Sequence, residues 1–318
     1  MDAPTRALPP VSLDDASALL GLAAQLLYIN GQTTRNVVER VQQVGRAIGY
    51  SAARFPDWGQ LIVRLEAVDG TKTEKIIAFD SSPVGVDMNK VMKTADVLDR
   101  VSTGRLDVRG AAAALKEVAR LAPTSTLRFA ALAGAGAAAL GVIFGDARSF
   151  SLALIALSAG AGAILRRFIA MRGGAALAQV LGAALLAGLV AAGAVRFLGV
   201  ADETLLALCP CMVLMPGPHF LNAALDFARL RVALGHARFS YAALLTLLIC
   251  VGLIAGLSLG WQSLPAPGPA TITPLMFDVL AAGVAVAAYG TFFSMPLARL
   301  TRSRRHRDAR SRFPMGRA

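Results

Sequence analysis

The spacing of hydrophobic residues changes several times along the chain, and each change predicts a different kind of element. From Ser12 to about Asn30, leucines and alanines recur on one stripe, as in an amphipathic helix. A second helical stretch, which ends at Gly49, carries valines on one face and charged residues on the other. The ordered part of the chain is therefore expected to begin with two helices, after a flexible, proline-rich start over residues 1–12.

A strand-like pattern follows these helices. Leu61, Val63 and Leu65 alternate with other residues, which is typical of a half-buried strand. Strands are expected over residues 51–55, 60–68 and 73–79, and further helices over residues 87–103 and 107–121. The pair Asp69-Gly70 predicts a tight turn between the last two strands. Residues 13–122 are thus predicted to form a small soluble α+β domain.

Apolar stretches dominate the rest of the chain. A spanning helix needs about 20 mostly apolar residues, and about six such stretches can be counted. They cover residues 129–144, 150–165, 174–195, 204–224, 241–259 and 276–296. The mean hydropathy is +0.57, and 14 of the 20 acidic residues lie before Phe129. We therefore expect a membrane all-α bundle of about six transmembrane helices over residues 123–298, preceded by the soluble domain.

Basic residues gather in every second connection between the predicted spans. They occupy the connections after the second and fourth spans and the tail over residues 299–318, whereas the other connections are poor in them. The positive-inside rule places basic connections in the cytoplasm. The soluble domain and the tail are therefore both expected to be cytoplasmic. The net charge of +12 belongs to these flanks, and without an aromatic platform beside it no nucleic-acid partner is expected.

The soluble domain offers little for catalysis. It contains no histidine, no cysteine and no glycine-rich phosphate loop, so the common nucleophile–base pairs are absent from its sequence. Asp57 with Asp80, or Glu66 with Glu74, is an alternative acid–base pair, but Glu66 and Glu74 are more simply interpreted as solvated charges of the hairpin. The three cysteines all lie in apolar runs. No cofactor and no metal site are therefore expected, and an enzyme anchored to the membrane is only an alternative.

The fourth predicted span contains a helix-breaking sequence. Pro216-Gly217-Pro218 must interrupt the hydrogen-bond ladder of a helix. Broken helices are tolerated in membranes where they line a cavity or are buried in protein, and in transporters such breaks point to the binding site. Pro216 and Gly217 are therefore candidate substrate-binding positions. His219, which follows directly, is either such a residue or a polar side chain at the membrane interface.

Two polar residues follow the break on one helical face. Asn222 offers a hydrogen-bond donor and an acceptor, and it is a candidate for binding substrate. Asp226, four residues later, could carry a coupling proton, or it could mark the end of the span and pair with Arg229 or Arg231. Asp278, at the start of the sixth predicted span, is either a second proton-coupling carboxylate or one stabilised by the helix dipole.

These residues resemble the threonine/serine exporter family and its relatives, the two-component succinate exporters. In that family the break has the pattern Pro-Gly-x-Pro-x-x-Asn-Ala-x-x-Asp, where x is any residue. The positions that fit are Pro216, Gly217, Asn222, Ala223 and Asp226, whereas Pro218-His219 departs from the pattern. The opening helices also fit, with Asn30-Gly31, Val38-Glu39-Arg40 and the stretch 45–49. The resemblance covers about residues 15–260.

The resemblance implies a secondary transporter in the bacterial inner membrane that exports small amino acids such as threonine or serine, coupled to protons. A dicarboxylate such as succinate is the alternative substrate. The sixth predicted span looks like the first helix of the family's second half. A separate second-half membrane subunit, or a homo-oligomer, is therefore an expected partner. A scaffold that does not transport is a further alternative.

Overall fold

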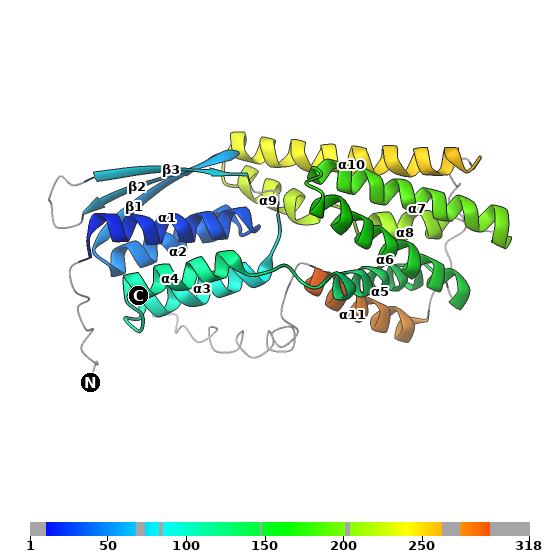
Figure 1. The fold of residues 1–318 in the computed structure, drawn as a ribbon, viewed down its shortest axis with the longest axis horizontal. Helices are drawn as coiled ribbons and strands as arrows, with labels where there is room; N and C mark the ends of the chain where they lie inside the picture. Colours follow the sequence, from blue (N-terminus) through cyan, green and yellow to red (C-terminus); the bar gives the residue numbers. More distant parts are fainter. Residues whose placement is uncertain are drawn as a thin grey trace, which may run out of the picture. The chain divides into compact units, whose positions relative to one another are not determined.

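The structure, a computed structural model, describes residues 11–67, 74–82, 85–146, 148–200, 204–262 and 274–292. Its contacts divide the chain into two compact units, whose elements are labelled in Figure 1. The first unit consists of Met1–Pro123 with Pro216–Ala242, and the second of Thr124–Met215 with Ala243–Ala318. Residues 216–242, expected from the sequence to belong with the membrane helices, therefore pack with the N-terminal part of the chain.

The N-terminal part of the first unit has the predicted α+β order. Its elements are α1 (Leu13–Ile29), α2 (Thr34–Ala47), β1 (Tyr50–Pro56), β2 (Gly59–Ala67), β3 (Glu74–Ser81), α3 (Met88–Ser102) and α4 (Val108–Arg120). The three strands form one antiparallel sheet in the order β1-β2-β3. The predicted helices and strands are confirmed here, while the predicted turn Asp69-Gly70 lies outside the described residues.

Side-chain caps define where these helices begin. Ser12 accepts a hydrogen bond from the Asp15 amide at 3.1 Å, and the Asp87 carboxylate accepts from the amides of Asn89 and Lys90, each at 3.1 Å. Such caps satisfy amides that have no partner within the helix. The connection between α1 and α2 turns at Gly31, whose φ of +89° is readily adopted by glycine.

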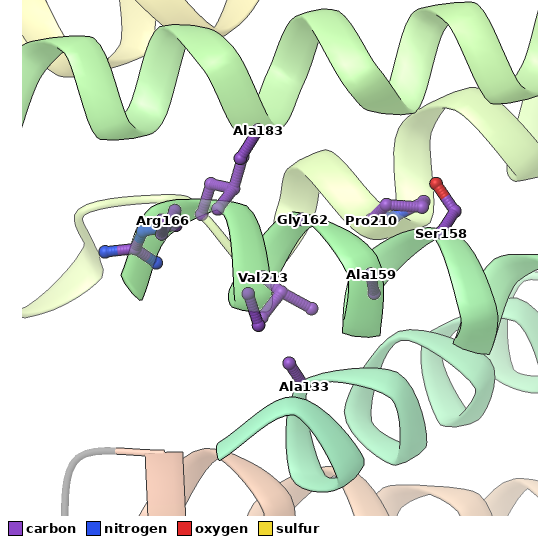
Figure 2. A pocket seen from close by; sticks show the side chains of 10 residues that line it. Ala133, Ser158, Ala159, Gly162, Arg166, Ala183, Pro210 and Val213 are labelled. Atoms are coloured by element: carbon purple, nitrogen blue, oxygen red, sulfur yellow. The ribbon is translucent and has the colours of Figure 1, made fainter. Parts of the chain in front are cut away.

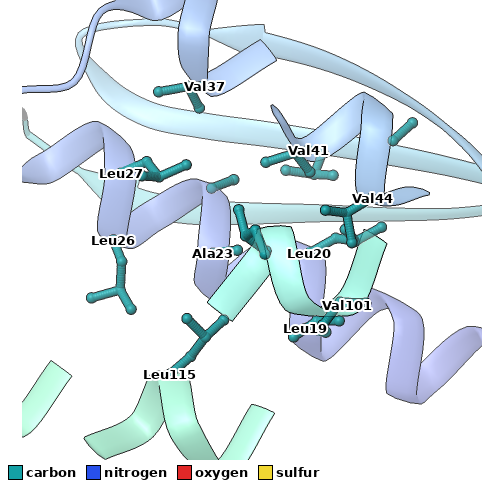
Figure 3. Close-up of a cluster of buried hydrophobic side chains, with 14 of the residues drawn as sticks. Leu19, Leu20, Ala23, Leu26, Leu27, Val37, Val41, Val44, Val101 and Leu115 are labelled. Carbon is teal, nitrogen blue, oxygen red and sulfur yellow. The ribbon is translucent and has the colours of Figure 1, made fainter. Parts of the chain in front are cut away.

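The hydrophobic core of the first unit lies between its helices and its sheet. Leu19, Leu20 and Leu27 of α1 belong to one buried cluster with the valines of α2, part of which is drawn in Figure 3. The alternation that predicted β2 is confirmed, because Leu61, Val63 and Leu65 are all fully buried. One residue of α10 (Val232–Leu259), Leu234, belongs to the same core. Residues 216–242, which include α9 (Gly217–Phe227), are thus part of this unit's packing.

The second unit is helical. It contains α5 (Thr126–Ile143), α6 (Ser149–Met171), α7 (Ala176–Leu198), α8 (Thr204–Met212), α11 (Leu275–Phe292) and the remainder of α10. Helix α6 packs against α5, α7 and α8, and α11 packs against α5 (Figure 1). The side chains between these helices are mostly alanine and glycine, so the helices approach one another closely, as small residues permit in membranes.

The expectation of six spans is only partly met. Among the described residues, α5, α6, α7 and α10 are long and apolar enough to cross a membrane. Helices α8 and α9 form an apolar pair with a bend of 57° at the break between them, and counting them as one broken span gives five. The sixth predicted span is a shorter apolar helix over Leu275–Gly290, and the predicted end of that span lies outside the described residues. Six spans are therefore not confirmed.

Glycines bring α7 and α10 into backbone contact. A Cβ atom at Gly252 would lie 2.7 Å from the carbonyl oxygen of Leu181, and one at Gly188 would lie 2.5 Å from that of Leu253. Side-chain atoms cannot occupy these positions without moving a helix. The repeat of Gly252 and Gly256 on α10 therefore marks a helix–helix contact. Small residues have this role in the packing of membrane helices.

Candidate functional site

The break predicted in the fourth apolar stretch is present between α8 and α9. Helix α8 ends at Met212, and the amide of Leu214 then donates to the carbonyl of Cys211 at 3.0 Å. Pro216 is the N-cap of α9, and its carbonyl accepts from the His219 amide at 3.0 Å. Pro218 fits the first turn of α9 because an amide there would have no partner within the helix. The departure from the family's proline spacing thus still gives a well-formed helix start.

Asn222 lies on the buried face of α9. The residue is 7% exposed, and Nδ2 of its side chain donates a hydrogen bond to the carbonyl of Gly31 at 3.3 Å. Gly31 forms the turn between α1 and α2, so the amide joins the segment after the break to the N-terminal helices. The contact connects residues 191 positions apart in the sequence.

Asp226 is the centre of a buried charged cluster. The residue is 1% exposed, and its carboxylate accepts a hydrogen bond from the Thr34 hydroxyl at 3.1 Å. The Nη1 atom of Arg238 lies 3.3 Å from Oδ2, and that of Arg231 lies 3.5 Å from Oδ1. The sequence suggested Arg229 or Arg231 as a partner, and the pair with Arg231 is present. Asp226 also lies near the end of α9, at the second-to-last residue.

Sequence reasoning missed Arg238 and Thr34 as partners of this carboxylate. Arg238 is 2% exposed, whereas the sequence pattern indicates only a basic residue that helps to orient the membrane helices. A signal was available, because Leu234 and Ala242, four residues before and after Arg238, are apolar. An arginine on an apolar helical face needs an acidic partner when that face is buried.

Tyr28 of α1 extends this cluster. The Arg238 guanidinium carbon lies 5.4 Å from the centre of the Tyr28 ring, within the range of a cation–π contact. The Tyr28 hydroxyl donates to the carbonyl of Asp57 at 2.9 Å. Burial raises the pKa of Tyr28, and the positive charge of Arg238 opposes this shift only in part. Tyr28 therefore links the cluster to the connection between β1 and β2.

Replacing Tyr28 by phenylalanine should lower the free energy of unfolding by about 1 kcal/mol at neutral pH, because the Asp57 carbonyl loses its donor. The raised pKa means that the folded state holds the phenolic proton more tightly than the unfolded chain. The stability it contributes is complete below about pH 10, the unfolded pKa, and is lost as pH rises through the folded pKa. Unfolding curves in detergent at several pH values should show the advantage of the wild type shrinking above that pH.

Tyr50→Phe is the matched control for this comparison, because the Tyr50 hydroxyl also donates to a backbone carbonyl, that of Val11, at 2.7 Å. It should leave the Arg238 cluster intact. If Tyr28→Phe unfolded like the wild type at neutral pH, the hydrogen bond to Asp57 would contribute nothing.

His219 lies in a row of aromatic rings in the first unit. It is 8% exposed, and its ring meets that of Tyr241 edge-on, with 5.2 Å between ring centres. Tyr241 in turn lies 5.2 Å from Trp58. The predicted residues Pro216, Gly217, His219, Asn222 and Asp226 thus all belong to the first unit. Asp278 belongs to the second unit, in the first turn of α11, where a carboxylate is favoured by the helix dipole.

A small cavity lies in the second unit, between α5, α6, α7 and α8. Figure 2 shows Ser158 and Arg166 of α6 on its wall, with Pro210 of α8 beside Ser158. Alanine and glycine form most of the remaining wall: Ala133, Ala159, Gly162, Ala163 and Ala183. The space open to the centre of a water molecule is about 10 Å³, which holds about one water. Neither Ser158 nor Arg166 was expected from the sequence to belong to a site.

Within the described residues, no group of three histidine, cysteine or acidic side chains could hold a metal ion. Cys209 and Cys211 of α8 are buried thiols without a disulfide.

Comparisons with known proteins agree with the resemblance inferred from the break. A family model described as "Putative threonine/serine exporter" (ThrE) matches residues 18–260. No curated protein and no solved structure matches the chain. The matched region contains the α+β elements, the break and the whole charged cluster around Asp226.

Proposed function

Because the matching family model covers most of it, the chain belongs to the threonine/serine exporter family, and from this we propose that it exports threonine, serine or a similar small amino acid. The apolar helices and the family together identify the chain as an integral membrane transport protein. The family is one of exporters and not of enzymes. The substrate and the coupling of transport to protons belong to the proposal.

One observation carries the proposal: an apolar helix pair is interrupted at Pro216, and buried polar side chains follow the interruption directly. A broken helix frees backbone groups and helix ends to contact a polar solute. Asn222 and Asp226 lie on one face just after the break and are both almost fully buried. Buried polar groups in an apolar helix are costly and usually serve function.

We propose that these residues couple substrate movement to the N-terminal helices. Pro216, Gly217, His219 and Asn222 provide the substrate-binding end of α9, and Asp226 and Asp278 are the candidate proton carriers. A proton on Asp226 would neutralise the carboxylate that holds Arg231 and Arg238. The ion pairs would then weaken, and the contacts from α9 to Gly31 and Thr34 would be easier to break.

The proposal places the protein in the bacterial inner membrane with both termini in the cytoplasm. The alternation of basic and non-basic connections supports this orientation. A separate second-half subunit or a second copy of the chain would complete the transport pathway.

Export can be tested in proteoliposomes with an imposed pH gradient and labelled threonine, serine and succinate. We expect threonine and serine to move, and Asn222→Ala to reduce their flux at least about tenfold, because it removes the amide that contacts the Gly31 turn. Asn36→Ala is the matched control, since Asn36 is an exposed residue of α2 and should leave flux unchanged. Movement of succinate alone would favour the dicarboxylate alternative, and flux that ignored the pH gradient would contradict proton coupling.

A further inference from the structure

Ser158 has an unusual environment for a serine inside a membrane helix. It is 3% exposed, and its hydroxyl has no hydrogen-bond partner among the described residues. Buried hydroxyl groups are nearly always hydrogen-bonded, so one without a partner requires an explanation. Ser158 lines the cavity in the second unit (Figure 2). A ligand in this cavity would supply the missing partner.

A second irregularity lies beside Ser158 (Figure 2). Pro210 lies inside α8 and has no amide hydrogen, so it cannot donate to the carbonyl of Leu206 one turn earlier. A proline in a membrane helix is tolerated where its surroundings satisfy or use the freed backbone. The cavity is therefore bordered by Ser158 and by the end of α8, where the helix breaks at Val213 and Leu214.

The depth of Ser158 fits a transport site. It is the tenth residue of α6, a helix of 23 residues, and it lies close to the middle of that helix. Substrate sites of secondary transporters lie near the middle of the bilayer, beside interrupted helices. Arg166 follows two turns later, about 12 Å along the axis at 1.5 Å per residue, towards the basic end of the helix.

Arg166 supplies a permanent positive charge to the same cavity wall. The guanidinium group binds carboxylates in a planar, two-pronged geometry and stays charged under all physiological conditions. At the basic end of α6 it can attract an anionic group before that group moves deeper. Most of the rest of the wall is alanine and glycine, with Val213 and Leu214, and the open space is only about 10 Å³, so a ligand must be small.

From these observations, and resting on the proposed export function, we propose that this cavity is the substrate position of the second unit in a closed form. Arg166 first attracts the carboxylate of an entering amino acid. Once the amino acid has moved deeper, the Ser158 hydroxyl pairs with the side-chain hydroxyl of threonine or serine. The ligand class is a small amino acid bearing a hydroxyl group. Because the cavity holds about one water molecule, the helices around it separate when the substrate enters.

The test compares threonine with alanine, which lacks the hydroxyl. In proteoliposomes, Ser158→Ala should raise the KM for threonine about tenfold and leave the KM for alanine unchanged, because only the hydroxyl loses its partner. Ser158→Thr keeps the hydroxyl and should restore preference for threonine. Ser151→Ala is the matched control, since Ser151 is a buried serine of the same helix that does not line the cavity.

Arg166→Gln should raise the KM for both substrates about tenfold, because both carry the carboxylate. Arg172→Gln, at the exposed end of α6, should change neither value. If Ser158→Ala exports with an unchanged preference for threonine over alanine, the cavity assignment is wrong while the export function stands.

Titration of the purified protein with threonine, measured by calorimetry, tests the cavity as a substrate position separately from the export function. Absence of flux for every substrate would contradict the export function. The titration would still decide on the cavity: binding by the wild type that is weakened about tenfold in Ser158→Ala supports it, and equal or absent binding overturns it.

Discussion

Replacing Arg238 by leucine should lower the free energy of unfolding by about 3–5 kcal/mol, the cost of breaking a buried ion pair by removing one partner. Asp226 would remain 1% exposed, with its nearest other cation, Arg231, 3.5 Å away and partly solvated. The contact of the guanidinium with Tyr28 would be lost as well. Chemical unfolding of the protein in detergent, followed by tyrosine and tryptophan fluorescence, measures this change.

A double variant and a control at an exposed ion pair show whether the Asp226–Arg238 pair behaves as a buried ion pair. Asp226→Leu combined with Arg238→Leu should recover much of the loss, because both fully buried charges are then removed, while Arg231 is partly exposed. Arg40→Leu removes a cation from the exposed pair with Asp99 and should cost at most about 1 kcal/mol. Equal losses for Arg238→Leu and Arg40→Leu would show that the Asp226 cluster does not behave as a buried ion pair.

The second large effect is expected where α7 meets α10. Gly256→Val should destabilise the second unit by about 3 kcal/mol, at the upper end for overpacking, because its Cβ atom would overlap the carbonyl oxygen of Leu185. The obstacle is backbone, so a change of rotamer cannot relieve it. The two helices must move apart, which removes the close contact that small residues allow. A lower melting temperature in detergent is the expected readout.

Gly283→Val is the matched control, since a Cβ atom at Gly283 on α11 would meet nothing within 4 Å. It should melt close to the wild type. If both valine variants melted alike, the loss would reflect helix propensity or hydrophobicity and not the contact between α7 and α10.

Sequence patterns predicted the N-terminal elements because each pattern reports a local property. The alternation of Leu61, Val63 and Leu65 reflects the two faces of one strand, and the structure confirms that all three are buried. The break at Pro216 was predictable for a similar reason, since proline lacks the amide that the helix requires. Such features depend on the residue and its near neighbours.

Contacts between distant residues could not be predicted in this way. Hydropathy describes α9 as part of a membrane span, but it does not show that Asn222 and Asp226 contact Gly31 and Thr34. The same limit applies to Ser158, which reads as an ordinary small residue of a membrane helix. Its exceptional feature is the lack of a hydrogen-bond partner, which only a three-dimensional arrangement can reveal.

The grouping of residues 216–242 with the N-terminal helices has a consequence for biosynthesis. A ribosome finishes Met1–Pro123 well before it reaches Pro216, roughly 90 residues later. At about 5–20 residues per second, that interval lasts roughly 5–20 seconds. During this time Thr34 and the Gly31 turn lack the partners they have in the finished protein. The first unit can therefore be completed only after α5, α6, α7 and α8 have been synthesised.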